Sequence, residues 1–175
     1  NFVGNTKGEE ITDYTLNYKG AAGSETVTTT TVYFYETEKR ASDEDVTSDS
    51  AMTESAVYKG DKNTAVYTDL AGIKSRTHYF GDKGEELADY SQNLKYDGMT
   101  LTVKDTTIYT YSGDVLDYTT TYVGGTIDSR VVTTLAMKSM TNFVGNVKGE
   151  EISDYTLNYK GDAGSETVST TTVYF

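Results

Sequence analysis

The chain has 175 residues, a formal net charge of −12 at pH 7 and a pI near 4.4. This charge repels phosphate, so nucleic acid and anionic membranes are excluded as expected partners, and no apolar run reaches the roughly 20 residues that a membrane span needs. Proline and cysteine are both absent, which excludes a disulfide framework and thiolate metal sites.

The composition favours strands, because it combines 16 tyrosines with many threonines and valines. The first predicted strand covers residues 11–18, where Tyr14, Leu16 and Tyr18 share one face at a period of two. A glycine turn at 19–23 leads into a second strand at 25–36, the most strongly β-forming run of the chain. Two strands joined by a short turn that contains glycine predict a hairpin.

The middle of the chain has weaker signals. Short strands are predicted at 56–58, 65–67 and 74–80, with one helical turn at 68–72. The acidic segment 43–49 is expected to form an exposed loop or a short helix. A second hairpin is predicted from strands at 87–96 and 100–111, which turn at Asp97-Gly98.

The sequence repeats itself. Residues 142–175 match residues 1–34, so one period runs from Asn1 to Thr141. The four differences are Thr6/Val147, Thr12/Ser153, Ala21/Asp162 and Thr28/Ser169. The chain is therefore expected to hold one full period and the start of the next.

A weaker repeat lies inside the period. The Lys-Gly-Glu-Glu tetrad begins at Lys7, Lys83 and Lys148, and the first of the two intervals is the longer. An insert at about 36–52 accounts for most of this difference in length. The predicted organisation is a first half-repeat at 1–77, a second at 78–141, and the start of the next period at 142–175.

Units of this kind bury apolar surface against their neighbours rather than in a closed core. We therefore expect an all-β fold, specifically an elongated tandem-repeat β-solenoid or a spiralling β-sheet. The alternative is a row of small β-sandwiches, like beads. The lack of proline-rich or low-complexity linkers disfavours this alternative.

One pattern occurs at 79–87 and again around Tyr96-Asp97-Gly98. It consists of an aromatic residue, a glycine turn with charges and a following tyrosine-rich strand. This pattern resembles YD/Rhs-type repeats and the tandem repeats of large bacterial surface and filament proteins. The resemblance implies β-hairpins wound into an extended sheet, used as shells, stalks or adhesive fibres. It assigns no functional residue to this chain.

No catalytic residue and no cofactor are predicted. His78 is the only histidine, and its counterparts in the other copies are Asn1 and Asn142, so a general base is not expected at this position. Without cysteine or a second histidine, no catalytic triad can be assembled. The paired glutamates of the Lys-Gly-Glu-Glu tetrads are interpreted as turn and edge residues.

Two kinds of ligand site are considered. Asp43, Glu44, Asp45 and Asp49 offer oxygen ligands for calcium, although the run lacks the spacing of a calcium-binding loop and a solvated loop is the preferred interpretation. The tyrosines are interpreted as a ladder within the sheet, with a carbohydrate-binding platform as the alternative. Threonine clusters that are expected to be exposed offer O-glycosylation sites, namely Thr28, Thr29, Thr30, Thr31, Thr119, Thr120 and Thr121.

These observations predict a non-enzymatic, structural repeat unit of an extracellular filament or surface fibre that acts by end-to-end stacking. Its expected partners are neighbouring copies of itself and glycans. The alternative is an adhesin stalk or a carbohydrate-binding surface module. The expected location is extracellular or on the cell surface.

Overall fold

The computed structural model describes residues 1–4 and 6–175, which form strands, turns and loops with no helix. Eleven strands make one antiparallel sheet, and two short strands pair separately. The prediction of an all-β fold is confirmed. Among these residues there is no helix with the length and hydrophobicity needed to cross a membrane.

The chain divides into two compact units. The first comprises Asn1–Ala88 with Leu94–Leu101, and the second comprises Asp89–Asn93 with Thr102–Phe175. The first unit contains β1 (Phe2–Val3), β2 (Ile11–Thr12), β3 (Tyr14–Lys19), β4 (Thr26–Tyr35), β5 (Lys39–Arg40), β6 (Met52–Lys59) and β7 (Ile73–Phe80). Strand β8 (Leu87–Tyr96) contributes residues to both units. The second unit contains β9 (Leu101–Ser112) from Thr102 onward, β10 (Val115–Val123), β11 (Met137–Val144), β12 (Ile152–Lys160) and β13 (Thr167–Val173).

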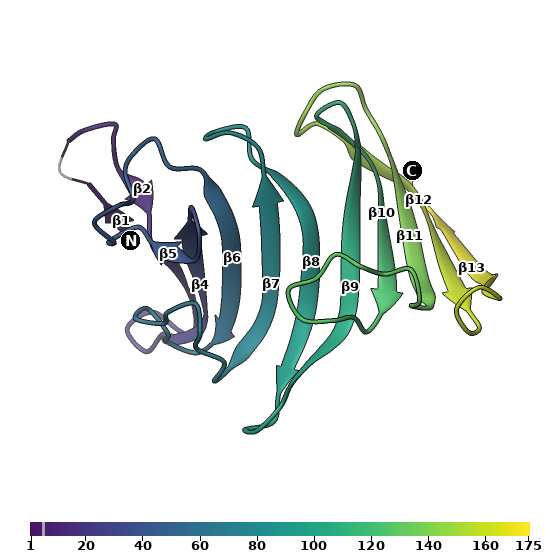
Figure 1. The fold of residues 1–175 in the computed structure, drawn as a ribbon, viewed down its shortest axis with the longest axis horizontal. Helices are drawn as coiled ribbons and strands as arrows, with labels where there is room; N and C mark the ends of the chain where they lie inside the picture. The colour runs from purple at the N-terminus through teal and green to yellow at the C-terminus, as the bar shows by residue number, and fades with distance from the viewer. Residues whose placement is uncertain (5) are drawn as a thin grey trace. The chain divides into compact units, whose positions relative to one another are not determined.

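Within each unit the strands pair with their neighbours in the chain (Figure 1). In the first unit, β3 pairs with β4, β4 with β6, and β6 with β7, while β5 pairs with the end of β4. In the second unit, β9, β10, β11, β12 and β13 pair in that order. All of these pairings are antiparallel, as expected for strands that are joined by short turns.

The core of the first unit lies on one face of β4 and β6. Thr30, Val32 and Phe34 alternate along β4 and are each fully buried. Ala56 and Tyr58 of β6 are also fully buried, and the Phe34 ring meets the edge of the Tyr67 ring at a centroid distance of 5.5 Å. Every second residue of β4 therefore faces the core, as the two-residue period of a strand requires.

The strand predicted at 65–67 is wrong, because these residues lie in a loop of successive turns between β6 and β7. The backbone carbonyl groups of Ala65 and Tyr67 accept hydrogen bonds from the guanidinium groups of Arg40 and Arg76. Since their carbonyl groups are used by side chains, these residues do not join the ladder. The predicted helical turn at 68–72 is also wrong, since turns occupy this segment.

The strand predicted at 11–18 is interrupted at Asp13, which separates β2 from β3. The second copy shows the reason. There Asn142 pairs with Tyr155 and Phe143 with Ser153, so the residue between the partners, Asp154, forms a β-bulge. A bulge redirects the side chain that it carries, and the Asp13 side chain is buried.

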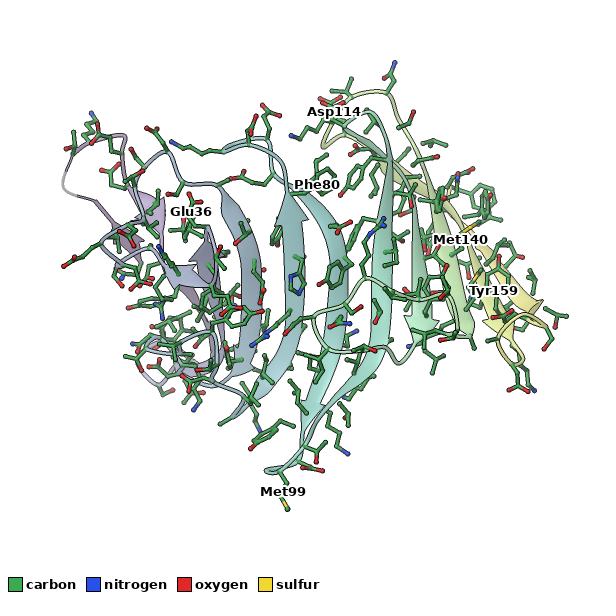
Figure 2. The ribbon with its side chains drawn as sticks, in the orientation of Figure 1. Glu36, Phe80, Met99, Asp114, Met140 and Tyr159 are labelled. Atoms are coloured by element: carbon green, nitrogen blue, oxygen red, sulfur yellow. The ribbon has the colours of Figure 1, made fainter. Side chains whose placement is uncertain are left out.

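The turn predicted at Asp97-Gly98 is present between β8 and β9, and Figure 2 shows Met99 at its tip. The Asp97 carboxylate accepts hydrogen bonds from the backbone N–H groups of Met99 and Thr100 at 2.9 and 2.8 Å. These donors lower the pKa of Asp97. Segment 43–49 forms the predicted loop rather than the alternative helix, with turns at 44–45 and 48–49.

Candidate functional site

Glycine turns that carry a glutamate shortly after a glycine are the most regular feature of the structure. In each of five turns, the glycine N–H donates to the Oε2 atom of that glutamate. The distances are 2.7 Å for Gly8–Glu10, 2.9 Å for Gly23–Glu25, 2.8 Å for Gly84–Glu86, 2.8 Å for Gly149–Glu151 and 2.9 Å for Gly164–Glu166. These glycines have φ between 79° and 88°, a region that glycine enters without steric cost.

In three of these turns the carboxylate also reaches a second strand. The Oε1 atom accepts the backbone N–H of Met52 for Glu86, of Leu116 for Glu151 and of Met137 for Glu166, at 3.1, 2.9 and 2.9 Å. Each carboxylate therefore connects its turn to a second strand, near the start of that strand. This second strand is the one that pairs with the strand preceding the turn. We call this arrangement the carboxylate clamp.

Backbone N–H donors favour the charged form of a carboxylate. The bonds from Leu116 and Met137 accordingly lower the pKa of Glu151 and of Glu166. The interpretation of the tetrad glutamates as turn residues omitted this second bond. The sequence signals only the bond to the glycine, since a glutamate follows the glycine at the same spacing in all five turns.

Side-chain contacts between paired strands recur at equivalent positions of the repeats. The tyrosine hydroxyl contacts a serine or threonine hydroxyl in the pairs Thr15–Tyr33, Ser91–Tyr109 and Thr156–Tyr174, at 3.4, 3.4 and 3.2 Å. An asparagine amide donates across the strands in the pairs Asn17–Thr29, Asn93–Asp105 and Asn158–Thr170, at 3.1, 2.6 and 3.1 Å. These tyrosines thus take part in cross-strand contacts of the kind expected of a ladder.

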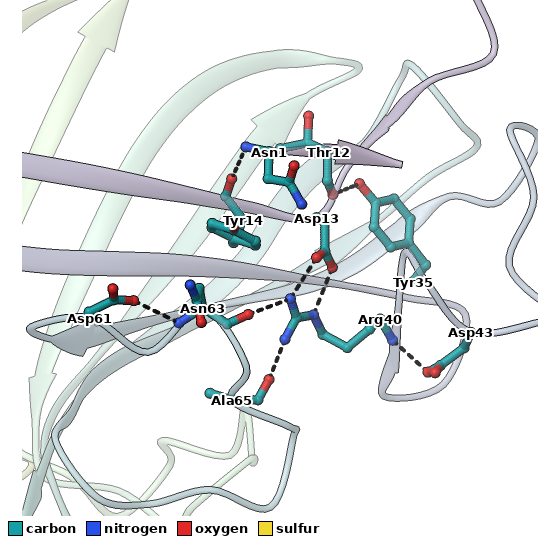
Figure 3. A network of polar contacts seen from close by, with 10 residues as sticks. All are labelled: Asn1, Thr12, Asp13, Tyr14, Tyr35, Arg40, Asp43, Asp61, Asn63 and Ala65. Atoms are coloured by element: carbon teal, nitrogen blue, oxygen red, sulfur yellow. Dashed lines mark hydrogen bonds and ion pairs between the residues drawn. The ribbon is translucent and has the colours of Figure 1, made fainter. Parts of the chain in front are cut away.

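A buried ion pair joins the insert to the first hairpin of the first unit (Figure 3). The Arg40 guanidinium donates from Nε and Nη2 to the two carboxylate oxygens of Asp13, both at 2.8 Å. The same guanidinium donates to the carbonyl groups of Asn63 and Ala65. Arg40 and Asp13 are 8% and 6% exposed, so this pair is almost completely removed from water.

The counterpart of Asp13 in the second half-repeat is Asp89, which holds the same place after its Lys-Gly-Glu-Glu tetrad. Asp89 accepts from Arg130 Nε at 2.7 Å, and the two side chains are 31% and 55% exposed. Arg130 comes from the loop between β10 and β11, whereas Arg40 comes from the insert. Two unrelated segments, the short strand β5 and the loop between β10 and β11, therefore supply an arginine to equivalent aspartates.

His78 lies in β7 beside Glu54 of β6, with 3.3 Å between Nδ1 and Oε2. On the other side of Glu54, Arg76 Nε lies 3.4 Å from Oε1. The Arg76 guanidinium also stacks over the Tyr67 ring at 4.2 Å. The histidine is thus one member of a polar cluster packed between two strands and a loop.

The four calcium candidates do not converge. Asp43 accepts the backbone N–H of Arg40 and Asp45 pairs with Lys39 Nζ, both at 2.8 Å. The Lys39 ammonium lowers the pKa of Asp45. In residues 1–4 and 6–175, no three histidine, cysteine, aspartate or glutamate side chains, including those of Glu44 and Asp49, are grouped as metal ligands.

The threonine candidates divide by exposure. Thr30 and Thr120 are buried, and the Thr30 hydroxyl donates to the Gly60 carbonyl at 2.7 Å, so the expectation of exposure is wrong at these two positions. Thr28 is exposed. The other four candidates, Thr29, Thr31, Thr119 and Thr121, are half-buried.

A shallow pocket in the first unit is lined by two tyrosines, Tyr33 and Tyr35, and by Ile11, Met52 and Glu86 among others. The Tyr35 hydroxyl donates to the Thr12 carbonyl at 2.6 Å. Burial, together with the nearby Tyr33 and acidic groups, raises the pKa of Tyr35 to about 12. This tyrosine therefore remains protonated and holds β2 in place, which makes it a structural group.

The loop between β10 and β11 is anchored by Gln92, which is fully buried at a position where the other copies have Leu16 and Leu157. Its amide donates to the Thr126 carbonyl at 2.8 Å and accepts from the Asp128 N–H at 2.9 Å. Sequence reasoning missed this anchor. The replacement of leucine by glutamine in one copy is the signal that identifies it.

Gly125 lies at the start of this loop with φ 144°, and a Cβ atom there would meet Thr106 Oγ1 at 2.4 Å. Overpacking of this kind typically costs about 1–3 kcal/mol beyond the backbone strain, so we expect Gly125→Ala to lower the free energy of unfolding by about 2–3 kcal/mol. Gly124→Ala is the matched control, because its φ is 76° and its Cβ would meet open space. It should cost only about 1 kcal/mol. Urea unfolding curves measure both values, and equal costs would contradict this packing.

The chain matches no family model, no curated protein and no solved structure.

Proposed function

We propose that this chain is a structural repeat unit of an extracellular filament or surface fibre, in which β units stack end to end. One observation carries the proposal. The same run of sequence ends in Val32 and Phe34 in one copy and in Val173 and Phe175 in the other. The first two side chains are fully buried, whereas Val173 is 50% exposed and Phe175 is fully exposed.

The difference arises from the neighbouring strand. In the first copy β4 pairs with β6 along Thr29 to Tyr35, and the loop that follows β6 brings Tyr67 against Phe34. Strand β13 repeats β4 and, within residues 1–4 and 6–175, pairs with β12 alone. The apolar residues of this strand are therefore accessible to a neighbouring repeat, as the stacking of units in a tandem array requires.

Within this proposal the repeats form a continuous spiralling sheet rather than a row of separate sandwiches. The boundary between the two compact units falls inside a strand, β8, and not in a linker. Domain boundaries in bead-like proteins fall in exposed linkers across which few contacts are made. Neighbouring copies of the same sequence are then the principal partner, and exposed threonines such as Thr28 are available to glycans.

The proposed role is architectural and not catalytic. The single histidine packs against Glu54, and the carboxylates of Glu86, Glu151 and Glu166 accept backbone N–H groups. These groups hold strands together, and near-identical repetition suits a fibre because each unit can dock on the next in the same way.

Electron microscopy of a chain that contains several full periods tests the proposal. We expect rods whose length increases in proportion to the number of periods. Rounded particles separated by flexible links would contradict the continuous sheet. Immunogold labelling of intact source cells tests the location, and labelling that requires permeabilised cells would contradict an extracellular fibre.

A further inference from the structure

The outer edge of β3 lacks a strand that its sequence counterpart possesses. Residues 155–160 in β12 repeat β3, and β12 pairs along this edge with β11. The partners there are Ser139 with Asn158, Met140 with Leu157 and Thr141 with Thr156. Strand β3 is the last in the order of the sheet, and among the residues that the structure describes it pairs with β4 alone.

The chain already supplies the end of the absent strand. Phe2 pairs with Thr12, and Val3 pairs with Ile11. The equivalent residues of the second copy have the same register, since Phe143 pairs with Ser153 and Val144 with Ile152. The N-terminal amino group of Asn1 donates to the Tyr14 carbonyl at 2.6 Å. Residues 1–3 thus occupy the last positions of a β11-type strand and lead directly onto the edge of β3.

Two side chains have fewer contacts beside β3 than their counterparts have beside β12, which pairs with β11 along this edge. Glu166 binds the N–H groups of Gly164 and Met137, whereas its counterpart Glu25 binds Gly23 and has no second donor within residues 1–4 and 6–175. Tyr18 is 58% exposed, whereas its counterpart Tyr159 is half-buried. An unfilled acceptor and an exposed aromatic ring therefore lie at the same edge.

We propose that the edge of β3 binds, by antiparallel strand addition, the segment of a preceding repeat that has the sequence of residues 135–141. The Glu25 carboxylate sets the register by accepting the N–H of the residue equivalent to Met137. This inference rests on the proposed stacking of repeats and specifies its contact. Strand addition of this kind satisfies the backbone groups of an edge, and pairing of alternate side chains makes it selective for sequence.

The test extends the chain at Asn1 by the sequence of residues 135–141, Leu-Ala-Met-Lys-Ser-Met-Thr. Hydrogen exchange of the amides of β3, followed by mass spectrometry, should become slower by about tenfold or more, because an added strand closes the edge. An extension of the same composition in scrambled order is the matched control. Equal protection by both extensions, or by neither, overturns the proposal.

Glu25→Gln tests the carboxylate clamp. In the extended chain this variant should lose most of the gained protection, since one acceptor oxygen becomes an amide donor. Glu10→Gln is the control, because its counterpart Glu151 binds Leu116, which the extension does not supply. Retained protection in Glu25→Gln overturns the assigned register.

The two proposals can fail separately. If chains of several periods form rods while the extension gives no protection to β3, stacking holds and this contact is wrong. If the extension protects β3 while chains of several periods form separate particles, the contact holds and the filament is wrong.

Discussion

Replacing Phe34 by alanine should lower the free energy of unfolding by about 3–5 kcal/mol, the usual cost of deleting a buried phenylalanine side chain. The Phe34 ring is fully buried on β4 and makes an edge-on contact with Tyr67. Removing it leaves a cavity between β4, β6 and the loop that covers them. Urea unfolding followed by tyrosine fluorescence measures the loss.

Phe175 is a matched control within the same chain, because both phenylalanines end the sequence Thr-Thr-Thr-Val-Tyr-Phe. Phe175 is fully exposed, so Phe175→Ala should change stability by less than about 0.5 kcal/mol. In a longer chain with a following repeat, the same substitution should become as costly as Phe34→Ala. Equal effects in the present chain would contradict the view that β6 and its loop bury the strand.

Replacing Arg40 by methionine should also lower the free energy of unfolding by about 3–5 kcal/mol, because it leaves the Asp13 carboxylate buried without its charge partner. The change removes four hydrogen bonds, two to Asp13 and one each to Asn63 and Ala65. The substitution is therefore expected to destabilise the loop between β6 and β7 as well, because Asn63 and Ala65 belong to it. Hydrogen exchange measured for that loop should accelerate together with the loss of global stability.

Lys39→Met is the control, since Lys39 is adjacent in sequence and forms an exposed ion pair with Asp45 at 2.8 Å. Solvent screens an exposed pair, so Lys39→Met should leave the free energy of unfolding almost unchanged. A double variant, Asp13→Leu with Arg40→Met, should be more stable than Arg40→Met alone, because it removes the uncompensated charge. If the double variant were less stable than Arg40→Met, charge burial would not be the cause.

Sequence reasoning predicted the strands best where local pattern decided the structure. Strand β8 was predicted with the observed bounds, Leu87–Tyr96, because alternation precedes an Asp-Gly turn. The strand at 65–67 failed for a reason that no local pattern contains. Its carbonyl groups accept hydrogen bonds from Arg40, which lies 25 residues before Ala65 in β5, and from Arg76, which follows the segment in β7.

The candidate site was predicted only in part for the same reason. The glutamates were correctly placed in turns, but their second partner, such as Leu116 for Glu151, belongs to a strand far away in the sequence and became visible only in the structure. The exposure of Thr30 was also predicted wrongly, because its hydroxyl is buried under Gly60 of a later loop. The sequence repeat determines which residue type stands at each position, whereas the neighbouring strand determines whether that residue is buried.

The pairing of strands with their neighbours in the chain has a consequence for synthesis. When β10 leaves the ribosome, its partner β9 precedes it, and the same holds for β11, β12 and β13 in turn. At each step one loop has to close, the longest being residues 124–136 between β10 and β11, and the entropic cost of closure rises only slowly with loop length. The time needed to add a strand is then independent of how many repeats have already folded, so an array of any length can be completed as quickly as it is translated.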